Sequence, residues 1–453
     1  MSADTDAITA GHAEAKRVFD AQQEHRWSAK QTTAQHRKAI LQRLRAEVVS
    51  STDEVITALY DDLGRPPGLS RAEIGAVLLD IDDALAHLDE WMAPTPVTPA
   101  AHFGAGAQAE IRYEGRGVVL LFGPWNFPFG LVFEPLVPII AAGNTCIVKP
   151  NELAPATSVV TARIIRSIFD EEHVAVLEGG VDLADTLLGL PVDHVFFTGS
   201  PAVGRIVMAK AAAHLASVTL ELGGKCPAVV DATANLSKAV QSIAVGKHQN
   251  AGQICLSPDH VWVHEDVRDE FTEGYLEWVS ANMCTGDSVD RSRLGRLVNK
   301  RNFDRVEEYV KDAVRRGATS ISPARDVSED LVVAPTVLLG VDDDSAVMQQ
   351  EIFGPVLPVM VYRELSTVVE SIRQHGKPLA MYIFSENEAV VEKVLAETSS
   401  GGVTVNGWAL HSADTSLPFG GVGSSGIGRY HGIHGFRELS HARSIFLAPK
   451  DNG

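Results

Sequence analysis

The sequence contains little cysteine. Only four of its 453 residues are cysteines: Cys146, Cys226, Cys255 and Cys284. They are far apart in the chain, so the close spacings typical of zinc and iron–sulfur sites are missing. We therefore expect no metal and no disulfide framework, and we consider each cysteine singly as a core residue or a nucleophile.

An excess of positive charge is also lacking. The chain has 39 Lys and Arg against 58 Asp and Glu, a net charge of −19 at pH 7. A surface this acidic repels the phosphates of nucleic acids and the headgroups of anionic lipids. We therefore expect a small-molecule substrate, with no nucleic-acid or membrane partner.

Long hydrophobic runs are missing as well. The most apolar stretch, 118–133, is shorter than the roughly 20 residues of a membrane-spanning helix and is interrupted by Pro124 and Pro128. The first residues, MSADTDAITAGHAEAK, lack the basic start and apolar core of a signal peptide. These features favour a location in the reducing cytoplasm.

The length of the chain, 453 residues, predicts two or more domains, because a single hydrophobic core stops growing at about 250–300 residues. Residues 30–93 carry apolar side chains at helical spacing, which predicts core-facing helices up to the prolines that follow Ala93. From 114 to 220 apolar runs alternate with helical segments, and a second such stretch runs from 221 to 408. This alternation predicts an α/β fold with parallel sheets covered by helices.

Two segments could bind a phosphate-bearing cofactor. FFTGSPAVGR places Gly199, Ser200 and Gly204 between a predicted strand and a predicted helix, where backbone N–H groups can approach a phosphate. The spacing is not G-x-G-x-x-G, and taken alone the segment is better explained as an ordinary strand–helix turn. CIVKPNE places Lys149 and Glu152 after a strand, where they could hold a ribose or form a solvated loop pair.

Three further residues could act on a carbonyl substrate. Cys255 in NAGQICLSP could be a nucleophile, although a single cysteine is more often a small core residue. Glu221 in TLELGGKCP lies among apolar residues, which can raise the pKa of a carboxyl group and suit it as a general base, or it could cap a helix or form an ion pair. The Asn126 amide in GPWNFPF could stabilise an oxyanion or simply form a turn.

Each of these signals is ambiguous alone, but together they resemble the successive signature blocks of the aldehyde dehydrogenase superfamily. The similarity covers residues 30 to 445. The blocks are GPWNFPF, GNTCIVKPNE, FFTGSPAVG, VTLELGGKCP, NAGQICLSPD, QEIFGPVLPV and LPFGGVGSSGIGRYHG. The wording of EIFGPVLPV, AETSSGGVTVN and the YHG ending is most similar to the class 3 branch, which includes fatty aldehyde and coniferyl aldehyde dehydrogenases.

The resemblance implies three structural parts. A Rossmann-variant NAD(P)-binding domain would comprise residues 1–94 and 114–220, and an α/β catalytic domain would comprise 221–408. A small bridging sheet for oligomerisation would comprise 95–113 and 409–445. Because a bridging sheet would otherwise leave an edge bare, we expect a homodimer.

The resemblance also implies a role for each matching residue. Cys255 would be the nucleophile, Asn126 and the Cys255 backbone N–H would bind the oxyanion, and Glu221 would be the general base. On the cofactor side, the expected roles are ribose binding for Lys149 and Glu152, pyrophosphate contact for Gly199, Ser200 and Gly204, and contact with the nicotinamide ribose for Glu351, with Phe353 beside it.

Three residues depart from the family pattern. Gln350 stands where many relatives carry a second Glu, Ile254 precedes the nucleophile where Thr is frequent, and Pro201 stiffens the phosphate turn. Because Gln350 cannot act as a base, one candidate carboxylate is lost, and the assignment of the general base relies more on Glu221. Because Ile254 is bulkier and more apolar than Thr, it should narrow the substrate tunnel or exclude water from it.

The predicted function is the oxidation of an aldehyde to an acid through a thiohemiacetal and a thioester on cysteine. NAD is the expected cofactor, with NADP possible, because Glu152 should repel a 2′-phosphate. By resemblance, the substrate is apolar, either aromatic or medium-to-long aliphatic. The alternatives are a CoA-acylating dehydrogenase, an esterase that uses Cys255, and a non-catalytic binding protein on the same scaffold.

Overall fold

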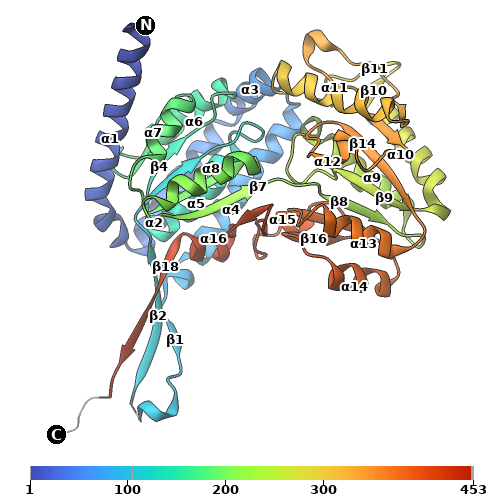
Figure 1. The fold of residues 1–453 in the computed structure, drawn as a ribbon. Coiled ribbons are helices and arrows are strands. Elements are labelled where there is room, and N and C mark those ends of the chain that lie inside the picture. The colour runs from blue at the N-terminus through green and yellow to red at the C-terminus, as the bar shows by residue number, and fades with distance from the viewer. Residues whose placement is uncertain (1, 105, 450–453) are drawn as a thin grey trace.

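The computed structural model describes residues 2–104 and 106–449. Residues 1 and 105, which fall in the predicted cofactor domain and arm, and residues 450–453 of the C-terminal segment lie outside the described residues. Figure 1 shows two α/β lobes side by side, with a narrow arm extending from the first. The predicted α/β class is confirmed.

Four helices form the N-terminal part of the first lobe. They are α1 (Ser2–Lys30), α2 (Ala34–Ser50), α3 (Thr52–Leu63) and α4 (Pro67–Met92). The Thr33 side chain caps α2 by accepting from the His36 N–H, and Pro67 takes the first turn of α4, where no N–H is needed. Gly64, with a φ of 59°, ends α3 in the left-handed conformation. These helices agree with the expectation for residues 30–93.

The first lobe is built on a six-stranded sheet with the order β17-β7-β6-β3-β4-β5. Its strands are β3 (Val118–Phe122), β4 (Thr145–Lys149), β5 (Val174–Val176), β6 (His194–Gly199), β7 (Ser217–Leu222) and β17 (Gly426–Ile427). Only β17 is antiparallel to its neighbour. The crossover helices are α5 (Gly130–Ala142), α6 (Pro155–Ile168), α7 (Val181–Leu188) and α8 (Pro201–Ala212).

The second lobe contains a seven-stranded sheet with the order β12-β13-β14-β9-β8-β15-β16. Its strands are β8 (Pro227–Val230), β9 (His260–His264), β12 (Thr319–Ile321), β13 (Thr336–Leu339), β14 (Val356–Tyr362), β15 (Ala380–Phe384) and β16 (Gly402–Val405). Its helices are α9 (Leu236–His248), α10 (Arg268–Met283), α11 (Lys300–Arg315), α12 (Ala346–Gln349), α13 (Leu365–Gln374) and α14 (Glu388–Glu397). All neighbouring strands are parallel except β12 and β13.

The arm is a three-stranded antiparallel sheet of β1 (Thr95–Val97), β2 (Gln108–Gly115) and β18 (Ser440–Leu447). The structure differs from the predicted arm segment 409–445, because only its last residues enter this sheet. Before them, β17 pairs with β7, and α16 (Gly432–Glu438) packs on α4 and α5. Residues 426–439 therefore pack on the first lobe, whereas α15 (Leu410–Ala413) contacts β16 of the second lobe.

The two sheets meet near the predicted boundary at residue 221. Strand β7 ends at Leu222 in the first sheet, and β8 begins at Pro227 in the second. The chain thus crosses from one lobe to the other through GGKC at 223–226, which begins two residues after Glu221. No helix among the described residues is long and apolar enough to cross a membrane.

Candidate active site

Four of the predicted site residues lie at one edge of the first sheet. Lys149 ends β4, Gly199 ends β6, and Glu221 is the penultimate residue of β7, while Asn126 follows β3 by a few residues. In the strand register, Lys149 pairs with Phe122, and Glu221 pairs with Thr198. Because the carboxyl ends of parallel strands meet at one edge, the topology gathers these residues where ligands bind to open α/β sheets.

Cys255 lies in the loop between the 3₁₀ turn η2 (Gln249–Gly252) and β9 and is half-buried. The Cys226 thiol donates to the Cys255 carbonyl at 3.2 Å. Burial and the charges of Glu351 and Glu221 raise the pKa of the Cys255 thiol, and the backbone N–H groups of Cys255 and Leu256 offset only part of this rise. A half-buried thiol with two carboxyl groups nearby therefore needs a base before it can attack.

Glu221 supplies a carboxyl group beside this thiol. The residue is 4% exposed, and neither carboxyl oxygen has a hydrogen-bond partner among the described residues. Burial raises the pKa of Glu221 well above its usual range, Arg429 opposes the rise, and Glu438 adds to it. A buried carboxyl group without a partner is costly for folding, which is typical of a group kept for chemistry.

Asn126 holds its amide next to the Cys255 loop. The Nδ2 atom donates to the Gln253 carbonyl at 3.1 Å, two residues before Cys255. An amide carries two N–H groups, so this bond fixes the plane of the side chain and leaves the second N–H for another acceptor. Asn126 is thus positioned to donate to an oxyanion formed near Cys255.

A buried network that sequence reasoning missed holds Asn126 in place. The Arg65 side chain is fully buried, forms an ion pair with Glu73 and donates to the Asn126 carbonyl. Asn250 donates to the same carbonyl at 2.9 Å and accepts from Arg65 at 3.2 Å. Glu73 in turn accepts from two backbone N–H groups at the start of α5, at 3.1 and 2.7 Å. Asn250 falls inside a recognised block, NAGQIC, whereas Arg65 carries no local signal.

Glu351 and Phe353 come from the loop before β14 and approach from the second lobe. The Glu351 carboxyl group lies against Gly223, where a Cβ would stand 2.3 Å from one of its oxygens and would push the carboxyl group aside. Burial and the Asp259 charge raise the pKa of Glu351 to about 8. The Phe353 ring packs edge-on against Trp125 with 5.5 Å between ring centroids, which joins this loop to the Asn126 loop.

Hydrogen bonds and an ion pair hold the backbone of the Glu351 loop in position. Lys225 forms an ion pair with Asp259 and donates to the Gln350 carbonyl at 3.1 Å. Asp259 accepts from the Ile352 N–H at 2.9 Å, and Arg305 donates to the Ile352 carbonyl at 2.7 Å. Sequence reasoning missed Lys225, Asp259 and Arg305, which act through the backbone and belong to distant segments.

The departures found in the sequence have local explanations. The Gln350 side chain accepts from the Tyr309 hydroxyl at 2.8 Å, so it anchors α11 instead of facing Cys255. Ile254 is partly buried and packs against the main core. Pro201 occupies the first turn of α8, where its fixed φ suits the helix start but removes one backbone donor.

The cofactor-side residues form two groups on the first sheet. Lys149 is almost fully buried, and its ammonium group pairs with the half-exposed Glu152. Ser200 caps α8 by accepting from the Val203 N–H at 3.4 Å. Gly204 is buried, and a Cβ there would stand 2.8 Å from the Leu222 side chain, so α8 can pack this close to β7 only with glycine.

These groups fit a dinucleotide at the carboxyl edge of the sheet. The helix N-terminus of α8 favours negative charge, although Pro201 and the Ser200 cap leave fewer free N–H groups than a standard phosphate turn offers. The Lys149–Glu152 pair combines a donor and an acceptor, as a sugar diol requires. The unpartnered Glu221 lies on the same edge, close enough to Cys255 for its charge to raise the pKa of the thiol.

Comparison with known proteins agrees with the resemblance seen in the sequence, over nearly the whole chain. The model of the aldehyde dehydrogenase family matches residues 3–445. The rat protein named aldehyde dehydrogenase, dimeric NADP-preferring, is 40% identical over 93% of this chain and 91% of its own length. The coniferyl aldehyde dehydrogenase of a Pseudomonas species is 37% identical over 90% of this chain and 85% of its own.

A solved structure extends the agreement to three dimensions. The substrate-bound state of Staphylococcus aureus AldH superposes with a TM-score of 0.92, at 37% identity over 97% of this chain and 95% of that one. The sequence blocks that surround Cys255, the topology of both sheets and these matches agree. The chain belongs to the aldehyde dehydrogenase family.

Proposed function

We propose that this NAD(P)-dependent aldehyde dehydrogenase works through Cys255 as nucleophile, Asn126 as oxyanion donor and Glu221 as general base. The observation that carries the proposal is the Glu221 carboxyl group, buried and without a partner beside a half-buried thiol. Such a group has no structural use in the unliganded protein. It suits a base that takes a proton in a water-poor site.

In the acylation half of the reaction, the Cys255 sulfur attacks the aldehyde carbonyl after losing its proton to a base. The carbonyl oxygen becomes an alkoxide, which accepts from the Asn126 amide and the Cys255 N–H. The Arg65–Glu73 pair holds the Asn126 backbone carbonyl, and thereby the backbone from which the amide side chain projects. Loss of one such donor typically costs about 10²–10³ in rate.

In the deacylation half, water attacks the thioester on Cys255. Glu221 takes a proton from this water, and its raised pKa makes it a stronger base than an ordinary carboxylate. The same Asn126 amide donates a hydrogen bond to the second alkoxide. The products are the carboxylic acid and the free thiol.

The proposed cofactor site uses Lys149 and Glu152 for the adenine-side ribose, the α8 N-terminus with Gly199, Ser200 and Gly204 for the pyrophosphate, and Glu351 with Phe353 near the nicotinamide ribose. A nicotinamide held there would supply the acceptor for the hydride released from the tetrahedral adduct on Cys255, which leaves the thioester. Glu152 favours NAD over NADP, because its negative charge repels a 2′-phosphate.

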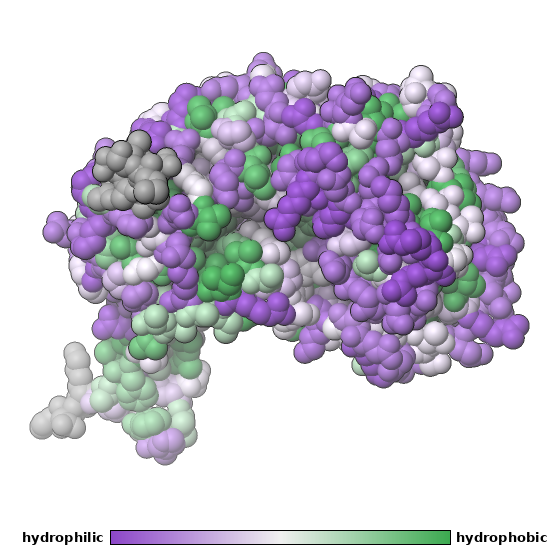
Figure 2. Space-filling model, turned by 45° about the horizontal axis from the view of Figure 1, so that its top comes forward, coloured by the Kyte–Doolittle hydropathy of each residue, from purple (hydrophilic) through white to green (hydrophobic). Residues whose placement is uncertain are grey.

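We further propose an apolar aldehyde as substrate and a homodimer as the working assembly. Aromatic side chains border the site, among them Trp125 and Phe353. The arm carries exposed apolar residues, visible in green in Figure 2, which a second copy would cover. A reducing compartment such as the cytoplasm would keep Cys255 a free thiol.

The test is to trap the acyl-enzyme. Enzyme mixed with aldehyde and NAD and quenched in acid should carry the acyl mass on the peptide that contains Cys255. The Cys255→Ala variant should bind NAD and form neither this adduct nor reduced cofactor, while Cys284→Ala serves as the matched control. An acyl group on another residue would refute the proposal.

A further inference from the structure

The Cys255 side chain projects from the centre of a tight turn. The Ser257 N–H donates to the Ile254 carbonyl at 2.9 Å, which closes a β-turn with Cys255 and Leu256 at its centre. Leu256 keeps a negative φ, which excludes a type II turn. Because type I and type II turns differ mainly in the direction of the central peptide, the Cys255–Leu256 peptide is the part of this turn whose orientation must be held.

The N–H end of this peptide faces the nucleophile. The Leu256 N–H and the Cys255 N–H both lower the pKa of the Cys255 thiol, against burial and the nearby carboxyl charges. Successive backbone N–H groups in a turn form a concavity that suits an anion, here the thiolate. The peptide is trans, so its carbonyl points away from its N–H.

The carbonyl end of the same peptide is held by Cys226. This fully buried residue directly precedes β8, and its sulfur lies 3.2 Å from the Cys255 carbonyl oxygen. The Ala380 N–H, at the start of β15, donates to the same sulfur at 3.4 Å. Because a carbonyl oxygen can only accept, the Cys226 thiol must donate in its bond to Cys255. The ends of two neighbouring strands therefore meet at this peptide.

Aromatic donors hold the next carbonyl instead. The Leu256 carbonyl accepts from the Tyr382 hydroxyl at 2.6 Å and from the Trp408 indole at 3.0 Å. These two bonds fix the peptide between Leu256 and Ser257, whose N–H closes the turn. Among the described residues, the Cys255 carbonyl accepts only from Cys226.

Ionisable groups face the two sulfurs from several elements. Those near Cys255 are Glu221 on β7, Glu351 before β14, Tyr382 on β15 and Tyr430 before α16. Those near Cys226 are Glu351, Asp259 and Lys247. Burial, together with the charges of Glu351 and Asp259, raises the pKa of Cys226 well above its usual range, so this thiol stays protonated and remains a donor.

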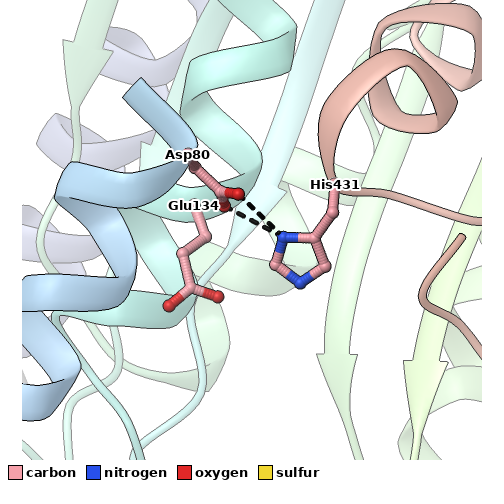
Figure 3. Close-up of side chains that lie close together, drawn as sticks. All are labelled: Asp80, Glu134 and His431. Carbon is pink, nitrogen blue, oxygen red and sulfur yellow. Dashed lines mark hydrogen bonds and ion pairs between the residues drawn. The ribbon is translucent and has the colours of Figure 1, made fainter. Parts of the chain in front are cut away.

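A further buried cluster lies behind Tyr430. The Tyr430 ring stacks on His431 with 4.2 Å between centroids. Figure 3 shows the His431 ring directed at Asp80, with 3.0 Å between Nδ1 and the carboxylate, and Glu134 beside the pair. Because His431 and Asp80 satisfy each other, this cluster supplies no donor to the Cys255–Leu256 peptide.

We propose that Cys226 is a positioning residue for the nucleophile, because its thiol holds the Cys255–Leu256 peptide with the Leu256 N–H directed at the Cys255 sulfur. The inference rests on the proposed role of Cys255. A donor on the carbonyl also polarises the peptide, which strengthens the Leu256 N–H as a donor. The Cys255 thiolate is thereby stabilised without a cation beside it.

Two substitutions of one residue test the proposal, because Cys226→Ser keeps a donor and Cys226→Ala removes it. Without aldehyde or NAD, the rate at which iodoacetamide alkylates Cys255 at pH 8 follows the thiolate fraction. We expect Cys226→Ala to react about 3–10-fold more slowly than wild type, because the pKa of Cys255 rises when the bond is lost. Cys226→Ser should stay within about twofold of wild type. Peptide mass spectrometry assigns the alkylated residue.

A second reagent and a second variant exclude a simple change of access. N-Ethylmaleimide is bulkier than iodoacetamide, yet a change in thiolate fraction should slow both reagents by the same factor. Cys226→Val also lacks a donor and takes the place of Cys226→Ala if the alanine variant folds poorly.

Cys146 provides the matched control. It is also fully buried and packs in the same core cluster, and burial alone raises the pKa of its thiol. A cysteine that only fills a core tolerates alanine better than serine, because serine buries a hydroxyl group without a partner. Cys146→Ala should therefore have a higher thermal midpoint than Cys146→Ser, and both should keep the wild-type alkylation rate. At Cys226 serine should be the better replacement.

The alkylation rates keep this inference separable from the proposed function. If no aldehyde reduces NAD, the proposed function fails, yet the rates still decide the role of Cys226. In an active enzyme, kcat/KM for the aldehyde should fall by the same 3–10-fold in Cys226→Ala, with little change in the KM for NAD. Three results would overturn the inference: a wild-type alkylation rate in Cys226→Ala, a slower rate in Cys226→Ser than in Cys226→Ala, or unequal factors for the two reagents.

Discussion

The Arg65 guanidinium donates to the backbone carbonyl of Asn126, so a fully buried charge determines where the proposed oxyanion donor lies. The two residues are separated by all of α4 in the sequence, and Glu73 on that helix balances the charge. The arrangement makes the α4–α5 junction part of the active-site support. Its disruption should therefore be visible in catalysis as well as in stability.

The first prediction concerns this support. Arg65→Met alone would leave Glu73 buried and unpaired, at a cost of roughly 3–5 kcal/mol, so the informative variant combines Arg65→Met with Glu73→Gln. We expect the double variant to fold and to show a kcat about 10²-fold lower, with little change in the KM for NAD, because the Asn126 amide loses its fixed direction. Steady-state kinetics and the thermal midpoint are the measurements.

An ion pair of the same kind on the surface provides the control. Arg45 and Asp82 pair across α2 and α4 with both side chains about half exposed. Arg45→Met with Asp82→Asn should leave kcat unchanged. If the Arg65 and Glu73 double variant also keeps the wild-type kcat, the network has no role in positioning Asn126.

The second prediction concerns Glu221. Glu221→Gln should still release a burst of reduced cofactor and then stall as acyl-enzyme, with a steady-state rate about 10²–10⁴-fold lower, because water loses its base. Stopped-flow absorbance and intact mass follow the two phases. Unchanged turnover would move the base role elsewhere, and Glu351→Gln is then the variant to examine.

The third prediction is a pH dependence. Burial raises the pKa of Cys255, so the thiol is protonated at neutral pH in the enzyme without cofactor, and the thiolate fraction increases as the pH rises. Alkylation of Cys255 by iodoacetamide should therefore accelerate by about tenfold per unit between pH 7 and 9. Peptide mass spectrometry gives the rate, with Cys255→Ser as background. A flat profile over this range would mean that the thiol is already ionised.

The fourth prediction concerns cofactor choice. Glu152→Thr removes the negative charge that should repel a 2′-phosphate and releases Lys149 from its ion pair. We expect the ratio of kcat/KM for NADP over NAD to rise by about tenfold, which corresponds to about 1.4 kcal/mol. Glu392→Thr, on the exposed face of α14, should not change the ratio. A ratio that stays constant in Glu152→Thr would remove this residue from the ribose site.

The fifth prediction concerns the arm. The Phe103 and Phe446 rings lie 4.8 Å apart, and both side chains are almost half exposed. Phe446→Glu should turn the expected dimer into a monomer, because it places a charge in the apolar patch. Light scattering after gel filtration measures the mass. Val181→Glu, a more exposed apolar site on α7, should leave the assembly intact.

Local sequence patterns predicted much of the fold. The helical periodicity of residues 30–93 and the apolar runs at β3, β4 and β6 predicted elements that the structure confirms, because each pattern reflects which side of one element faces a core. The structure of the C-terminal segment was harder to predict from the sequence. Residues 409–439 show no periodicity that distinguishes a pairing with β7 from a pairing in the arm, and only the complete sheet decides between them.

The family, the α/β class and the candidate catalytic side chains followed from the sequence alone, because Cys255, Glu221 and Asn126 each lie in a short, specific block. The surroundings of these side chains are set by the three-dimensional packing. These surroundings depend on contacts between segments far apart in the chain. They include the unpartnered state of Glu221, the hydrogen bond from Arg65 to Asn126 and the approach of Glu134 to His431. Burial, charge pairing and pKa are properties of those contacts, and no local run of residues encodes them.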